Sequence, residues 1–164
     1  PEWIEFVVHE TFLGATGDLV FTVWPHRLAR MDWTTREITT IAEYNAWHIA
    51  PNRTGTRILC DTNHPDEGLQ IVDVRTGARS QVCLSEASNH GTQWTRSRYA
   101  LAEDFAAARS RAAGPNVLSW METATDTVYG PQWTHPHPSW SSDESKAAFA
   151  SDRTGITEVY VVEL

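Results

Sequence analysis

The chain has 164 residues, of which 41% are hydrophobic and 21% charged, enough to form the core of one ordinary domain. Its formal net charge is -8, with scattered acidic residues and no basic tract, which argues against a nucleic-acid backbone or an anionic membrane surface as a partner. No apolar stretch reaches the length of a membrane span. We therefore expect a single domain over residues 1–164 that binds neither nucleic acid nor membranes.

The sequence opens at Pro1 without an initiator Met, and no signal-peptide pattern of basic and apolar segments follows. This start predicts that part of the protein lies upstream. Because the true N-terminus would then be out of view, the sequence says little about the compartment. A cytoplasmic location is the working expectation.

Two cysteines each lie inside an apolar stretch, Cys60 in Ile58-Leu59-Cys60 and Cys83 in Val82-Cys83-Leu84. A thiol in such surroundings behaves as a small hydrophobic group, so we expect two buried free thiols and no disulfide. No paired-cysteine spacing indicates a structural zinc site.

Short apolar runs separated by Gly, Asn, Asp and Pro predict β-strands joined by tight turns. Three stretches share one plan: a strand with His or Trp, a polar turn, an apolar strand, a second turn and another apolar strand. They begin at His9, His48 and near His137, with polar turns at 15–18, 52–55 and 142–145 and final strands at 27–33, 69–74 and 159–162. Such repetition is typical of β-propeller blades, whose apolar faces are buried only by neighbouring blades. The sequence thus predicts an all-β chain of about three blades, part of a larger propeller.

Residues 99–114, between the second and third repeats, have a different composition. The run from Ala100 to Arg109 favours a helix, which the break at Gly114-Pro115 would end. We expect a short helical insertion packed on the propeller surface. A flap over a functional site is the alternative.

The clearest chemical signal is the segment Gln132-Trp133-Thr134-His135-Pro136-His137-Pro138. Side chains two apart on an extended chain share a face, and a following proline favours extended backbone at each His. His135 and His137 are therefore expected to project together. With the carboxamide of Gln132 they could give a divalent ion two nitrogens and one oxygen, and a further ligand must come from elsewhere. The alternative is that the prolines shape a turn and the histidines cap neighbouring strands.

This segment, followed by Ser139-Trp140-Ser141 and Ser151-Asp152-Arg153-Thr154-Gly155, resembles the metal-binding blade of the oligogalacturonate lyase family. The resemblance extends over essentially the whole chain and implies the C-terminal part of a propeller with an expected seven blades. In that family a manganese ion is bound by three His and one Gln, which match His48, His135, His137 and Gln132. Spacing alone leaves other divalent transition metals open.

The family's catalytic base matches His9, for which pairing with Glu10 at a strand end is the alternative role. The resemblance implies metal-assisted β-elimination in α-1,4-linked galacturonate oligomers from pectin. A base removes the C5 proton beside the carboxylate, and the C4–O bond breaks to leave an unsaturated uronate. A bound cation would stabilise the enolate-like transition state.

This sequence departs from the family pattern in two places. Ser141-Ser142-Asp143-Glu144-Ser145 replaces the usual Pro-Asp-Gly turn, which we expect to weaken that turn locally. The family's second catalytic group is an Arg on a blade that would precede Pro1. The activity of this chain alone is therefore left open.

Two other interpretations remain. Residues 140–161 also resemble the generic blade of the periplasmic protein TolB, which would make the chain a non-catalytic protein-binding module. A propeller domain of a serine peptidase related to prolyl oligopeptidase is the third, although the end at Leu164 directly after a strand counts against it. Neither has a use for the clustered His-Pro-His-Pro, so metal binding would separate them from the lyase.

Overall fold

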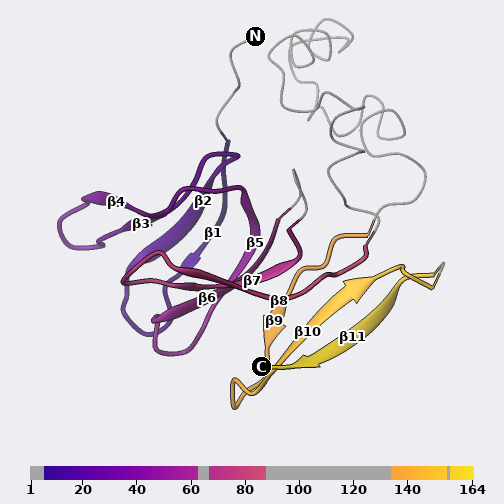
Figure 1. Ribbon diagram of the computed structural model, residues 1–164. Helices are drawn as coiled ribbons and strands as arrows, with labels where there is room; N and C mark the ends of the chain where they lie inside the picture. The colour runs from indigo at the N-terminus through magenta and orange to yellow at the C-terminus, as the bar shows by residue number, and fades with distance from the viewer. Residues whose placement is uncertain (1–5, 63–66, 88–133, 155) are drawn as a thin grey trace, which may run out of the picture.

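The computed structural model describes residues 6–62, 67–87, 134–154 and 156–164, which form three antiparallel β-sheets (Figure 1). The first sheet contains β1 (Phe6–Phe12), β2 (Leu19–Trp24), β3 (Arg27–Met31) and β4 (Ile38–Ala42). The second contains β5 (Ala46–Pro51), β6 (Arg57–Thr62), β7 (Leu69–Asp73) and β8 (Arg79–Cys83). The third contains β9 (Ser139–Trp140), β10 (Lys146–Ser151) and β11 (Glu158–Glu163). No helix in the described part of the chain is long and apolar enough to cross a membrane.

Each sheet is a meander in which strands that follow one another in sequence are hydrogen-bonded neighbours. The three sheets lie next to one another in chain order, from indigo to yellow in Figure 1. This confirms the all-β fold and the three blade-like repeats, each with its polar turn between the first two strands of its sheet. The helix expected over 99–114 lies outside the described residues.

The outer strands β4 and β8 were missed from the sequence. Most of their side chains are exposed, as the pattern of three exposed residues at the start of each strand shows. An edge strand with polar residues on both faces carries no alternation of apolar and polar residues, so periodicity could not reveal it. The two thiols are free as predicted, with Cys60 buried and Cys83 half-buried.

The main core lies between the first and second sheets. Leu13, Val20 and Leu28 on one side pack with Ile58, Cys60 and Val72 on the other. Each fully buried aliphatic side chain of this size contributes about 1.5–3 kcal/mol relative to an exposed one. The two sheets therefore stabilise each other through apolar contact.

The turn between β1 and β2 rests on the turn between β5 and β6. The Ala15 N–H donates to the carbonyl oxygen of Arg53 at 2.9 Å. A Cβ added at Gly14 would lie 2.5 Å from the carbonyl oxygen of Asn52 and 2.5 Å from the nitrogen of Gly55. Gly14 also has a φ of +54°, which L side chains rarely adopt. Only glycine fits this contact.

The same β5–β6 turn is also bound by the third sheet. The Glu144 carboxylate accepts hydrogen bonds from Asn52 Nδ2 at 2.9 Å, from the Arg53 N–H at 3.0 Å and from Arg57 at 2.9 Å. Nearby, the indole N–H of Trp140 donates to the carbonyl oxygen of Ala50 at 2.7 Å. Glu144 lies in the turn between β9 and β10, so this turn contributes to the contact between the second and third sheets.

Replacing Gly14 with Ala should destabilise the protein more than replacing Gly17 with Ala. Both glycines have positive φ, but a Cβ at Gly17 would meet nothing within 4 Å. The Gly17 variant should therefore lose only the conformational term of about 1–2 kcal/mol. The Gly14 variant should lose about 3 kcal/mol or more, because the backbone of the neighbouring turn must also move. Urea unfolding of both variants measures the difference. Equal losses of unfolding free energy would contradict the close contact between the β1–β2 turn and the β5–β6 turn.

Replacing Glu144 with Gln should reduce stability at neutral pH and have less effect in acid. Hydrogen bonds from Asn52 and Arg53, together with Arg57, lower the pKa of Glu144 below its ordinary value of 4.5. A depressed carboxyl pKa contributes stability above the unfolded-state pKa, and that contribution disappears as the pH falls through the folded-state pKa. Unfolding curves of both proteins from pH 7 to pH 3 should therefore converge. A difference in the free energy of unfolding that stays constant over this range would exclude an ionic role for Glu144.

Candidate metal centre

His48 lies on β5, where pairing with β6 is irregular between Ala46 and Ile49. Instead of joining the regular ladder, its backbone N–H donates to Asp61 Oδ1 at 2.7 Å. Its ring Nδ1 lies 2.7 Å from Asp61 Oδ2. The His48 side chain is buried, and the carboxylate of Asp61 holds both its backbone and its ring.

His135 and His137 lie in the segment that leads into β9. His135 is half-buried and His137 is exposed. The sequence predicted extended backbone at both, but this is wrong for His137, whose φ is +43°. Its N–H turns toward Asp61 Oδ2, at 3.2 Å, and this bond offsets part of the strain of a left-handed residue before proline.

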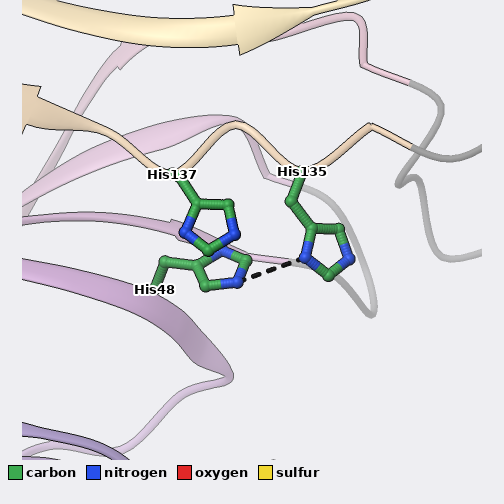
Figure 2. A group of neighbouring side chains, drawn as sticks. All are labelled: His48, His135 and His137. Atoms are coloured by element: carbon green, nitrogen blue, oxygen red, sulfur yellow. Dashed lines mark hydrogen bonds between the residues drawn. The ribbon is translucent and has the colours of Figure 1, made fainter. Parts of the chain in front are cut away.

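The three imidazoles converge in spite of that bend (Figure 2). His135 Nδ1 lies 3.2 Å from His48 Nε2, and the ring of His137 stacks on that of His48 with centroids 3.4 Å apart. One ligand atom from each of the three rings lies within 4.8 Å of the others. The second and third sheets thus bring together three of the four predicted ligands.

The donor atoms fit a divalent transition metal. Nitrogens bound about 2.0–2.1 Å from one ion lie roughly 2.9–3.4 Å apart for bond angles of about 90–109°, and the His48–His135 separation falls in that range. Because Nδ1 of His48 faces a carboxylate, its Nε2 can present a lone pair. Imidazole suits several divalent transition metals, so the donor set does not select one ion.

Burial sets the charge of these rings. Burial, followed by the nearby histidines, lowers the pKa of His48 and of His135 to about 2. Both rings are therefore neutral at neutral pH, which is the form that binds a metal. Burial raises the pKa of Asp61 to about 7, and the backbone N–H groups of His48 and His137 oppose this rise.

His9, the predicted base, lies beside this cluster. It occupies the irregular part of β1, where the pairing with β2 shifts between Val8 and Thr11, and its φ is +59°. Its ring centroid lies 4.8 Å from that of His48, and its buried Nδ1 has no hydrogen-bond partner among the described residues. Burial and the nearby His48 lower the pKa of His9 to about 4, so the ring is neutral and able to accept a proton.

Gln132, the fourth predicted ligand, lies outside the described residues. Asp61 was not predicted as part of the site. It lies in the buried strand segment Leu59-Cys60-Asp61-Thr62, where every side chain is buried. A carboxylate inside such a strand was the signal that could have identified it, because a buried charge requires bonded partners.

Comparison with known proteins shows the fold. No protein-family model and no curated protein matches the sequence. Among solved structures, the chain is similar to an oligogalacturonate lyase in complex with manganese, with 20% identity, a TM-score of 0.63 and coverage of 98% of this chain and 35% of that one. An oligogalacturonate lyase from Vibrio parahaemolyticus is 16% identical, with a TM-score of 0.59 and coverage of 97% and 36%. TolB from Acinetobacter baumannii is 10% identical, with a TM-score of 0.58 and coverage of 98% and 30%.

The chain thus spans about a third of each of these structures. At such identities the similarity establishes a fold relation to propeller proteins, and three blade-like sheets agree with a partial propeller. The predicted fold class is confirmed.

The low pKa values of His48 and His135 predict how the metal-free protein responds to acid. Their NMR ring shifts should stay constant from pH 8 to pH 5. In the unfolded chain the same rings bind protons below about pH 6.5, so the stability that they contribute is complete above that pH and falls below it. A His135→Gln variant should lose less stability than the native protein between pH 7 and pH 5. Ring titration near pH 6.5 in the folded protein would contradict the burial of these groups.

Proposed function

We propose that the chain is the metal-binding part of an oligogalacturonate lyase, which cleaves short α-1,4-linked galacturonate oligomers of pectin by metal-assisted β-elimination. The observation that carries this proposal is the convergence of His48, His135 and His137 from two sheets, with His9 beside them. The fold similarity to a lyase in complex with manganese supports it.

His48, His135 and His137 would hold the ion, with Gln132 as the expected fourth ligand and Mn²⁺ as the proposed metal. When bound, the ion supplies positive charge to the substrate carboxylate and so stabilises negative charge that develops next to it. This charge matters because the chain itself has a net charge of -8 and the proposed substrate is an anion.

His9 is the proposed base. Its Nδ1 has no partner among the described residues, and the ring is neutral at physiological pH, so it can accept the C5 proton. The C5–H electron pair then forms the C4–C5 double bond, and the C4–O electron pair leaves with the oxygen of the departing sugar, which takes up a proton. The products are an unsaturated uronate and a shortened oligomer.

Metal content tests the centre directly. The purified chain should contain about one divalent transition metal per molecule by elemental mass spectrometry, because the site offers neutral, pre-positioned imidazoles. The His135→Ala, His137→Ala double variant should contain none. His26→Ala is the control, since His26 lies exposed in the β2–β3 turn and should not affect the metal. A folded native chain without metal would overturn the metal site.

Activity tests the base. In full-length protein supplied with Mn²⁺, His9→Ala should reduce the release of unsaturated uronate, followed by its ultraviolet absorbance, by about 100-fold or more. The metal content should not change, because His9 is not a proposed ligand. Full activity in the His9→Ala variant would assign the base to another residue, and His26→Ala again serves as the control.

A non-catalytic binding module is the second candidate. The fold similarity to TolB covers 98% of this chain at a TM-score of 0.58, nearly the value for the lyases. Under this alternative the three histidines would pack without an ion. The absence of metal from the folded native chain would make it the leading interpretation.

A further inference from the structure

Asp61 on β6 is a carboxylate with no exposed surface, at the contact between the second and third sheets. Within the described part of the chain, all three hydrogen bonds of its carboxylate go to two of the proposed ligands. Oδ1 accepts the backbone N–H of His48, and Oδ2 faces His48 Nδ1 and accepts the backbone N–H of His137. Burial of a carboxylate is unfavourable unless such bonds compensate it.

We infer that Asp61 is the positioning residue of this centre, one that sets two ligands from two sheets without touching the ion itself. The inference rests on the proposed metal site. Asp61 determines which nitrogen of His48 is available, and it fixes the backbone from which His137 projects.

The tautomer of His48 follows from the other two bonds. The backbone N–H groups of His48 and His137 donate to Oδ1 and Oδ2 of Asp61. The ionised carboxylate has no proton to donate, so with Asp61 ionised the hydrogen between Oδ2 and His48 Nδ1 is carried by Nδ1. The lone pair of His48 is therefore on Nε2, the atom that lies 3.2 Å from His135 Nδ1.

The backbone of His137 depends on the same carboxylate. Its φ of +43° is unusual for a residue with a side chain, and it stands directly before Pro138. The bond from its N–H to Asp61 and the stacking of its ring on His48 hold this conformation. Without the carboxylate the segment could relax toward extended backbone, which would move the ring of His137 away from the other two.

Asp18 offers a matched control for a buried carboxylate. It lies in the first sheet's β1–β2 turn, where it pairs with Arg30 and accepts the backbone N–H of Trp33 at 3.1 Å. Like Asp61 it is buried and bonded to a backbone donor. Unlike Asp61, it bonds to none of the histidines, so its loss should affect stability alone.

The test compares Asp61→Asn and Asp18→Asn in the 164-residue chain. An Asn amide cannot accept three donors, and its NH₂ group would face His48 Nδ1 as a donor, which favours a proton on Nε2 and blocks the ligand atom. We expect Asp61→Asn to weaken Mn²⁺ affinity about 10- to 100-fold, measured by calorimetry. In the metal-free protein, long-range ¹H–¹⁵N NMR should show His48 change from Nδ1–H to Nε2–H. Asp18→Asn should change neither measurement.

The outcomes separate this inference from the proposed function. Native protein that binds Mn²⁺, together with unchanged affinity in Asp61→Asn, would overturn the inference and leave the metal site intact. Native protein that binds no metal would remove the proposed function, while the tautomer of His48 would still decide the role of Asp61. If Asp61→Asn does not fold, the native protein at pH 8 suffices, because His48 found there as Nε2–H would overturn the inference.

Discussion

Each sheet of this protein can bury its apolar face only against the next sheet, and the rest of the structure depends on that constraint. Between the first two sheets, aliphatic side chains from both sheets bury each other in a shared core. The contacts between the second and third sheets include polar ones made by Glu144 and Trp140. The candidate centre lies at this second contact, where His48 meets the segment that precedes β9. Docking of the sheets, and not the fold of any one of them, creates the site.

Much of this arrangement could be predicted from the sequence. Turn residues and short apolar runs located the inner strands, because those strands are buried and their turns need Gly, Asn or Asp. The outer strands β4 and β8 were not predicted, because exposed edge strands need no apolar pattern. The pairing of His135 with His137 followed from a two-residue spacing, but the left-handed backbone at His137 did not. That conformation depends on an acceptor more than 70 positions away in sequence, which local rules cannot include.

Asp61 shows the same limit of prediction from local sequence. Its sequence context predicts a buried strand residue, and only the register of β5 on β6 reveals that it faces His48. The centre combines several energetic costs: a buried and a half-buried neutral histidine, a buried carboxylate, and positive φ at His9 and His137. Proteins tolerate such costs where function requires them, and their concentration at one place is itself an argument for a site. Elsewhere in the described chain, buried groups are mostly apolar or bonded within turns.

Because the histidines come from two sheets, metal binding at the centre is also linked to the stability of the contact between those sheets. An ion held by His48 and His135 would connect the second sheet directly to the third. Its binding free energy would then add to the docking of those sheets, because any opening of that contact must release the ion. Separation of the third sheet would become less favourable as the ion concentration rises, whereas the free energy of the apolar contact between the first two sheets would not depend on the ion. Under that linkage the concentration of free metal would set how stably the second and third sheets stay together, and removal of the metal would reverse the effect.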